Sequence, residues 1–297
     1  MVSTKTGSFA IGYRLIGSPW QRDLSRAIEF ATASGFECLD VGAVDAPSLR
    51  SIRAAGLAIG SADLPGFVGE LITADLAKRK RAVDRAIEFI TMAAAEGVRR
   101  FFTVLLPDDV DADRETTLGQ MVEAYGPLCE VLTRAAPDGR IVIEGYPGRG
   151  PQYAALGCTP ESLRAIFARL PNQPLGINFD PSHLVRMGID PERFLREFGG
   201  RVGHVHAKDC QLLPEGAYEF GILQSATLAR PHAWGGHAWR YVIPGHGQVR
   251  WPAILQILAD NGYRGFLSVE LEDEEFNGTP GGEMAGLIAS RDYLARL

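Results

Sequence analysis

Four short apolar segments of this chain each end near an oxygen or imidazole side chain that could bind a metal. The segments are IVIEG at Glu144, GINFDPSH at Asp180, VGHVHAKD at His206 and FLSVE at Glu270. In a barrel of parallel strands, side chains at the carboxyl ends of successive strands converge at one place, so these residues could hold one divalent cation. A buried carboxylate without a partner is costly, and a cation is a natural partner for it. The expected chemistry is that of a metal centre.

Two neighbouring residues compete with these ligands. Glu272 points the same way as Glu270, because side chains two apart in a strand share a face, but Glu272 lies further into the loop. His204 shares a face with His206 but lies deeper, where a hydrogen-bonded core histidine is expected. We therefore predict that Glu270 and His206 are the ligands.

The predicted ligand set contains two Glu, one Asp and one His, which is a hard, oxygen-dominated set. It favours Mn²⁺, with Mg²⁺, Co²⁺, Fe²⁺ or Zn²⁺ as alternatives, because structural zinc sites usually carry more Cys or His. His183 follows Asp180 in a DxxH turn and is expected to orient a bound water or a sugar hydroxyl, with capping or packing of the turn as its alternative role. For Glu144 the alternative is a salt bridge to a neighbouring Arg or Lys.

Eight apolar runs rich in β-branched residues alternate with mostly amphipathic helical stretches. The runs cover residues 8–13, 36–41, 57–62, 98–105, 140–145, 174–180, 202–207 and 265–270. This alternation predicts a parallel sheet, and eight such units predict one closed (β/α)8 TIM barrel, an α/β fold, as a single domain over residues 1–297. Thr159-Pro160 and Asp190-Pro191 are predicted helix starts, and Gly126-Pro127 is a place where a helix could bend or divide.

The longest interval between expected strands runs from Asp209 to about Arg264. Its residues from about 210 to 248 are rich in Gly and aromatic side chains, and we predict that they form a lid over the site, because loops after barrel strands build active sites. An oligomer contact is the alternative. Flat apolar faces and histidines suit sugar rings. The side chains of this kind are Tyr218, Trp234, Trp239, Tyr241, His232, His237 and His246, of which we select Trp239 and His246 as substrate contacts.

The composition excludes several classes of protein. With 297 residues, 46% of them hydrophobic, and a mean hydropathy of -0.02, the chain can bury a large core. A net charge of -6 and a pI near 5.6 argue against nucleic acid or an anionic membrane as partner. Four widely spaced cysteines, no signal-peptide core and no long apolar run predict a cytoplasmic protein with reduced thiols. The amphipathic residues 283–297 are expected either to close the barrel exterior or to contact another subunit. Both a homo-oligomer and a hetero-partner are therefore open.

Several motifs resemble those of the sugar phosphate isomerase/epimerase family, also described as xylose isomerase-like TIM barrels. The motifs are NFDPSHLVRMGIDP, HVHAKD, WRYVIPGHGQVRW and SVELED, and the resemblance runs from Gly12-Tyr13 through SVELED. By position, the resemblance implies the metal ligands Glu144, Asp180, His206 and Glu270. It also implies that Glu144 and Glu270 move the proton and that His183 contacts substrate, as the matching residues do in related ketose 3-epimerases.

The chain departs from those epimerases shortly after the strand-seven histidine. They carry an Arg there, whereas this chain has Lys208-Asp209-Cys210-Gln211-Leu212. We predict that Lys208 binds substrate or stabilises charge, with a salt bridge to Asp209 or another acid as the alternative. Tyr13 is a further predicted substrate contact.

The resemblance and the ligand set together predict a metal-dependent sugar isomerase or epimerase. A metal on the carbonyl and adjacent hydroxyl of a sugar or keto sugar would acidify the α-C–H and stabilise an enediolate, with Glu144 and Glu270 as base and acid. The alternative is a lyase of the inosose dehydratase or 3-keto-glycoside type, in which a β-substituent leaves and His246 or His237 supplies a proton. The acidic balance argues against a zinc apurinic endonuclease, and four converging ligands argue against a non-catalytic sugar-binding protein.

Overall fold

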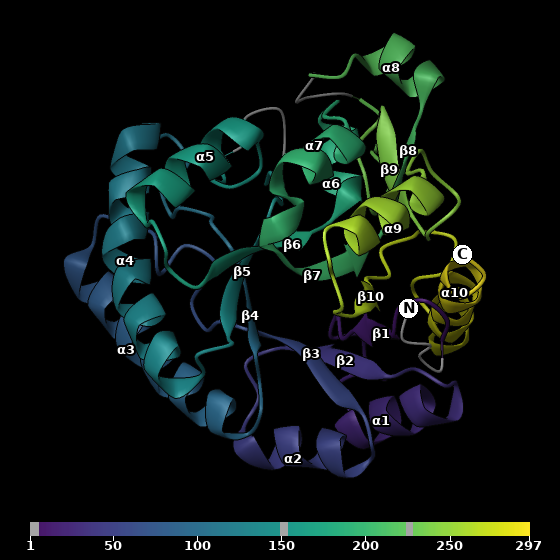
Figure 1. Ribbon diagram of the computed structural model, residues 1–297. Helices are drawn as coiled ribbons and strands as arrows, with labels where there is room; N and C mark the ends of the chain where they lie inside the picture. Colours follow the sequence, from purple (N-terminus) through teal and green to yellow (C-terminus); the bar gives the residue numbers. More distant parts are fainter. Residues whose placement is uncertain (1–5, 149–153, 224–227) are drawn as a thin grey trace.

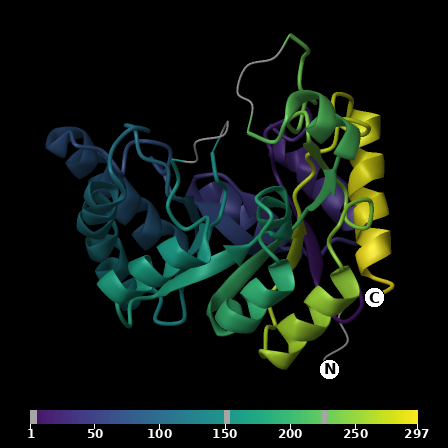
Figure 2. The ribbon, with the colours of Figure 1, turned by 90° about the horizontal axis from the view of Figure 1, so that it is seen from above.

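Eight parallel strands close a barrel in the order β1-β10-β7-β6-β5-β4-β3-β2 (Figures 1 and 2). The structure is a computed structural model that describes residues 6–148, 154–223 and 228–297. The strands are β1 Ile11–Arg14, β2 Cys38–Val41, β3 Ala58–Asp63, β4 Arg100–Val104, β5 Arg140–Glu144, β6 Leu175–Phe179, β7 Val202–Ala207 and β10 Leu267–Val269. Each coincides with one of the eight apolar runs, so the predicted (β/α)8 barrel is confirmed.

Helices surround the barrel (Figure 1). They are α1 Leu24–Ala33, α2 Ala46–Ala54, α3 Leu76–Ala95, α4 Arg114–Ala135, α5 Pro160–Arg169, α6 Pro181–Arg186, α7 Pro191–Phe198, α9 Trp251–Asp260 and α10 Pro280–Leu294, with a 3-10 turn at Gly199–Arg201. Thr159 and Asp190 cap α5 and α7 as predicted, and α4 continues through Pro127 without a break. Helix α10 packs on β1 and β10, so the C-terminal residues cover the barrel exterior. Within the described ranges, no helix combines the length and the apolar character needed to cross a membrane.

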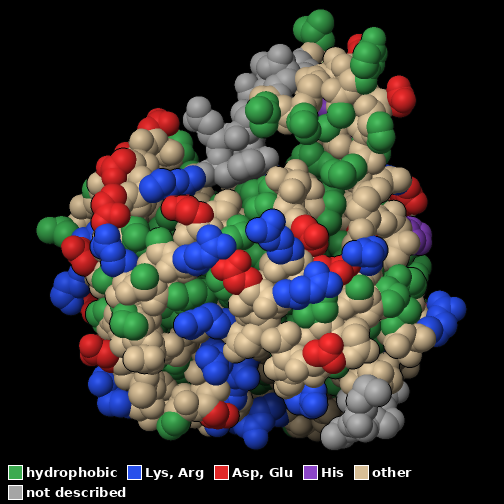
Figure 3. All heavy atoms as spheres, turned by 45° about the horizontal axis from the view of Figure 1, so that its top comes forward, with side chains coloured by type: hydrophobic (Ala, Val, Ile, Leu, Met, Phe, Trp, Pro, Cys, Tyr) green, Lys and Arg blue, Asp and Glu red, His purple; other side chains and the backbone are tan. Residues whose placement is uncertain are grey.

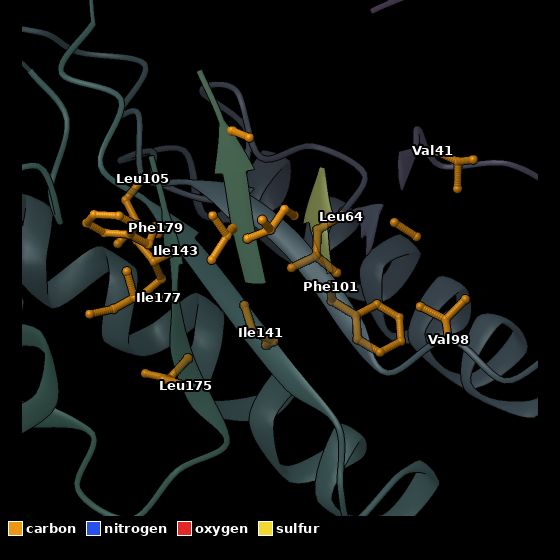
Figure 4. Close-up of a cluster of buried hydrophobic side chains, with 14 of the residues drawn as sticks. Val41, Leu64, Val98, Phe101, Leu105, Ile141, Ile143, Leu175, Ile177 and Phe179 are labelled. Carbon is orange, nitrogen blue, oxygen red and sulfur yellow. The ribbon is translucent and has the colours of Figure 1, made fainter. Parts of the chain in front are cut away.

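The strands separate an outer apolar layer from a polar interior by simple alternation. Ile141 and Ile143 of β5 belong to the large core between strands and helices, where Leu175, Ile177 and Phe179 of β6 join them (Figure 4). The alternate positions of the same two strands carry Val142, Glu144, Gly176 and Asn178. Each of these two strands therefore packs against the helices with one face and places polar side chains, Glu144 and Asn178, in the barrel interior with the other.

An excursion leaves the barrel after β7. It contains β8 Asp209–Leu212, α8 Pro214–Phe220 and β9 Trp239–Val242, and β8 pairs with β9 in an antiparallel two-stranded sheet. Helix α8 projects away from the barrel (Figures 1 and 2), and exposed apolar side chains gather over it (Figure 3). These include Tyr218, Ile222, Leu223 and Leu228. The predicted insertion is present, although residues 224–227 lie outside the described residues, and its role as a lid stays a prediction.

The base of this excursion is fixed by Asp209. Its carboxylate accepts hydrogen bonds from the backbone N–H of Gly245 and Val249, both at 3.0 Å, and from Trp251 Nε1 at 3.1 Å. Asp209 and Trp251 are fully buried. Burial raises the pKa of Asp209 even though these donors favour the carboxylate. The hydrogen bonds of this one side chain thus connect the segment after β7 to the start of α9.

Asp209→Ala is expected to lower the free energy of unfolding by about 3 kcal/mol, because it leaves several buried donors without an acceptor. Urea unfolding measures the loss. The control Asp84→Ala removes an exposed i,i+4 partner of Lys80 and is expected to cost about 0.5 kcal/mol or less. Equal losses in the two variants would contradict the anchoring role of Asp209.

Candidate metal centre

The structure brings the four predicted ligands together at the carboxyl ends of their strands. Glu144 is the last residue of β5, Asp180 follows β6, His206 lies in β7 and Glu270 follows β10. All four are buried. His206 Nδ1 lies 2.6 Å from Glu144 Oε2 and 3.6 Å from Glu270 Oε2. Strands far apart in sequence thus place two carboxylates around one imidazole.

His183 lies in the same cluster. Its Nε2 is 3.4 Å from both Glu144 Oε1 and Asp180 Oδ2, and ligand atoms of Glu144, Asp180, His183 and Glu270 all lie within 4.8 Å of one another. Asp180 caps α6 with Oδ1, which accepts from Ser182 N at 2.9 Å, and this leaves Oδ2 for the cluster. His183, predicted as a catalytic residue that orients a bound water or a substrate hydroxyl, is therefore close enough to be a further ligand.

The donor atoms fit a divalent cation. Asp180 Oδ2, His183 Nε2 and His206 Nδ1 are buried, and among the described residues none has a hydrogen bond of good geometry. Buried polar atoms are normally paired, and carboxylates gathered in one place repel each other unless a positive charge lies between them. Carboxylate oxygens with imidazole suit Mn²⁺ and related ions. Glu144, Asp180, His206 and Glu270, with His183, are thus the residues that could hold the metal.

Lys208 supplies positive charge at the edge of this cluster. Its Nζ lies 2.5 Å from Glu270 Oε2, 2.9 Å from Glu272 Oε2 and 3.2 Å from Asp180 Oδ2. Burial alone would lower the pKa of Lys208, but Asp180, Glu270 and Glu272 together raise it well above its ordinary value. Lys208 thus forms ion pairs with three acids, whereas its neighbour Asp209 bonds to the base of the excursion.

Both glutamates are held as carboxylates. Burial and Glu270 raise the pKa of Glu144, but the positive charge of His206 and the close imidazole nitrogens of His183 and His206 hold it below its ordinary range. Burial likewise opposes ionisation of Glu270, and Lys208 and His206 outweigh burial, so the pKa of Glu270 is well below its ordinary value. Two unprotonated carboxylates in one buried site could each accept a proton.

Polar residues deeper in the barrel orient the candidate ligands. Asp40 Oδ2 lies 3.3 Å from His206 Nε2 and makes a 2.7 Å hydrogen bond with His204 Nε2. Asn178 Nδ2 donates to Glu144 Oε2 at 2.7 Å. The expectation that His204 is a hydrogen-bonded core histidine is confirmed. Carboxylates behind a ligating histidine commonly fix the orientation of its ring.

Sequence reasoning missed a second polar group at the ends of the first and third strands. Arg14 donates two hydrogen bonds to Asp63, at 2.8 and 3.0 Å, and its Nε lies 3.1 Å from Glu270 Oε1. Its guanidinium also lies over the ring of Phe102, 4.3 Å from the centroid. Glu144 and Glu270 were selected because each is a charged residue at the end of an apolar run. Arg14 and Asp63 directly follow the first and third apolar runs, so the same reasoning would have identified them.

Tyr241 connects the excursion to the site. Its Oη lies 2.7 Å from His183 Nδ1 and accepts a hydrogen bond from Arg186 Nη1 at 2.8 Å. Arg186 also lies over the ring of Trp239, at 4.1 Å. Burial raises the pKa of Tyr241 far above its ordinary value, although Lys208 and Arg186 oppose this. Tyr241 therefore remains a neutral phenol, and β9 carries both Tyr241 and the predicted contact Trp239 to the site.

Two other predicted substrate contacts lie away from this cluster. Tyr13 occupies an outward position of β1, is fully buried and donates a hydrogen bond to the Ala27 carbonyl at 2.8 Å. The prediction that Tyr13 contacts substrate is wrong, because strand alternation turns Gly12 and Arg14 inward and Tyr13 toward the helices. His246 is exposed on the turn after β9, and its contact with substrate stays a prediction.

Tyr241→Phe is expected to lower turnover about tenfold, because it removes the hydrogen bond that orients His183 while leaving the ring in place. Metal content should change little. Steady-state kinetics and metal analysis of the purified variant measure the two effects. Tyr218→Phe, on the exposed surface of α8, is the matched control and should behave as wild type. Equal turnover in both variants would contradict a role for Tyr241 in orienting His183.

Curated relatives match part of the chain. The uncharacterized protein YfiH of Bacillus subtilis (strain 168) is 37% identical over 137 residues, which are 46% of this chain and 41% of that protein. The inosose dehydratase of Clostridium botulinum (strain Eklund 17B / Type B) is 29% identical over 155 residues, which are 52% of this chain and 47% of that enzyme. The chain thus spans less than half the length of either relative.

Structural similarity covers nearly the whole chain. The structure of an L-ribulose 3-epimerase superposes with a TM-score of 0.71 over 97% of this chain and 94% of that chain, at 18% identity, which shows a shared fold. The family model described as xylose isomerase-like TIM barrel matches residues 26–297. The chain therefore belongs to the xylose isomerase-like TIM barrel family, as the motifs predicted.

Proposed function

We propose that this chain is a divalent-metal-dependent isomerase or epimerase of a sugar or keto sugar. The observation that carries the proposal is the convergence of Glu144, Asp180, His183 and Glu270 in one buried cluster at the carboxyl ends of the strands. His206 lies against this cluster, 2.6 Å from Glu144 and 3.6 Å from Glu270. Active sites of this fold are built at that end. The shared fold with L-ribulose 3-epimerase supports the same reading.

Glu144 and Glu270 are the proposed base and acid. One carboxylate removes a proton from the carbon next to the substrate carbonyl, and the electron pair of the broken C–H bond moves into an enediolate. Because both glutamates start as carboxylates, the other glutamate must first take up a proton from solvent, which it then gives to the enediolate, and the base releases the abstracted proton to solvent. Return to the opposite face of the same carbon gives an epimer, and return to the neighbouring carbon gives an isomer.

The remaining polar residues position the substrate and balance its charge. A divalent cation, with Mn²⁺ favoured, would act as a Lewis acid that makes the α-C–H more acidic. Lys208 neutralises Glu270 and Asp180 and lies where a substrate oxygen could replace Glu272 as its partner. His183, held by Tyr241, is placed to hydrogen-bond a substrate hydroxyl or to join the metal ligands.

A lyase reaction is the second candidate. It starts with the same proton abstraction, but the electron pair expels a substituent on the β-carbon. The departing oxygen takes a proton, proposed to come from His246 or His237, and leaves as water or as an aglycone. The similarity to inosose dehydratase favours this reading. The aromatic excursion after β7, whose Trp239 packs against Arg186 of α6, could contact a leaving group.

Product analysis by NMR with a panel of free sugars, keto sugars and 3-keto-glycosides distinguishes the two reactions. Appearance of an epimer or isomer with the mass of the substrate supports the first proposal. Release of water or of an aglycone, with an unsaturated or dehydrated product, assigns the lyase reaction instead. Turnover that continues unchanged after removal of the metal would contradict both.

A further inference from the structure

A cavity of about 840 Å³ lies at the end of the barrel opposite the candidate metal centre. Its lining includes Ala58, Arg100, Arg140 and Val202, which are the first residues of β3, β4, β5 and β7. The metal-site candidates lie at the carboxyl ends of the strands, and a layer of polar side chains separates them from the cavity. His204 lines the cavity, and its Nε2 bonds to Asp40 Oδ2, which lies 3.3 Å from His206 Nε2. The cavity is therefore a second site and not an extension of the first.

Positive charge dominates this cavity although the whole chain carries a net charge of -6. Of the described residues, no Asp or Glu belongs to its lining, whereas five arginines do, namely Arg53, Arg99, Arg100, Arg140 and Arg264. Among the residues that the structure describes, only Arg99 of these five has a carboxylate partner, Asp138 at 2.9 Å. Four arginines thus line one hollow without a carboxylate at ion-pair distance in the described part of the chain.

Two of these arginines lie side by side. A Cβ added to Gly203 would be 3.5 Å from Arg140 Cδ and 3.6 Å from Arg100 Cδ, so both side chains run past the same glycine. Arg100 Nε donates to the Gly203 carbonyl at 2.8 Å, which fixes one of them. Burial lowers the pKa of Arg100, and Arg140 and Arg99 add to this, although Tyr263 and Asp138 oppose them. A bound anion would relieve this repulsion.

We propose that the cavity binds a small molecule that carries phosphate groups. Guanidinium groups form paired hydrogen bonds with phosphate oxygens, and four of them suit a multiply charged anion better than a single carboxylate. The volume falls within the range of about 300–1,000 Å³ typical of small-molecule sites. A long nucleic acid would need an extended basic surface, and the net negative charge of the chain repels it.

Titration calorimetry of the full chain with inorganic pyrophosphate, and separately with inorganic phosphate, tests this proposal. The metal is removed first with a chelator and the chelator is then removed, so that pyrophosphate has no cation to bind. We expect saturable binding at one site per chain, tighter for pyrophosphate. Arg140→Ala and Arg264→Ala, both at exposed positions, should each weaken it about tenfold. Arg140→Lys should weaken it less, because the charge is kept.

Two controls locate the site. Arg193→Ala removes an exposed arginine of α7 outside the cavity and should leave binding unchanged, and so should Glu270→Gln in the candidate metal centre. The proposal is overturned if wild type gives no saturable binding, if Arg193→Ala weakens binding as much as Arg140→Ala does, or if Glu270→Gln abolishes it. Thermal unfolding of each variant confirms that a loss of binding comes from a folded protein.

Discussion

Glu270→Gln is expected to lower the rate of substrate C–H exchange by about 10²–10⁴-fold, because it removes a carboxylate that is both a proposed proton acceptor and a candidate metal ligand. The substitution keeps the size of the side chain and removes its charge. It also breaks the 2.5 Å ion pair with Lys208 and the 3.1 Å pair with Arg14. NMR measures the uptake of solvent deuterium into substrate, and metal analysis of the purified variant separates loss of metal from loss of the base.

Glu272→Gln is the matched control for this experiment. Glu272 lies two residues further along the chain and also pairs with Lys208, at 2.9 Å, but it is outside the group of potential ligands. Its exchange rate should stay within about tenfold of wild type. The assignment of Glu270 would be contradicted if Glu272→Gln lost exchange and Glu270→Gln retained it.

Lys208→Met is expected to destabilise the metal-free protein by about 3–5 kcal/mol, because Asp180, Glu270 and Glu272 would lose their shared buried cation. Mn²⁺ should restore much of this stability in the variant, since a cation held by Asp180 and Glu270 replaces part of the missing charge. The increase in unfolding temperature on adding Mn²⁺ should therefore be larger in Lys208→Met than in wild type.

The control for Lys208 is Lys80→Met, which removes an exposed lysine that pairs with Asp84 four residues later. It should change the free energy of unfolding by about 0.5 kcal/mol or less and leave the response to Mn²⁺ unchanged. A Lys208→Met protein as stable as wild type without metal would show that the three acids do not need the ammonium group. An unchanged response to Mn²⁺ would show that metal and lysine do not share the same carboxylates.

The barrel and its main ligands could be predicted because both follow from local patterns. Ile141-Val142-Ile143 marks a buried strand, and the charge of Glu144 directly after it marks the end where such strands converge. The same reasoning applies to Glu270 after Phe266-Leu267-Ser268-Val269. Each inference needs only the sequence of one strand and the rule that parallel strands end at one face.

Contacts that depend on the assembled barrel could not be predicted in this way. Arg14 and Glu270 meet only because β1 pairs with β10 when the barrel closes, and Tyr241 reaches His183 only through the path of the excursion. The error on Tyr13 has a different cause. The resemblance drew attention to the Gly12-Tyr13 segment, whereas strand alternation decides which of its side chains faces the interior.

The measurement that tests the central claim most directly is solvent deuterium exchange in wild type, with the panel of sugars and keto sugars, before and after removal of the metal. We predict that deuterium enters at the carbon next to the carbonyl of at least one substrate in the Mn²⁺-loaded protein, and that chelation stops this and Mn²⁺ restores it. Exchange that is unaffected by chelation, or Mn²⁺ bound by Glu144, Asp180, His206 and Glu270 without exchange in any sugar of the panel, would contradict the proposed proton transfer.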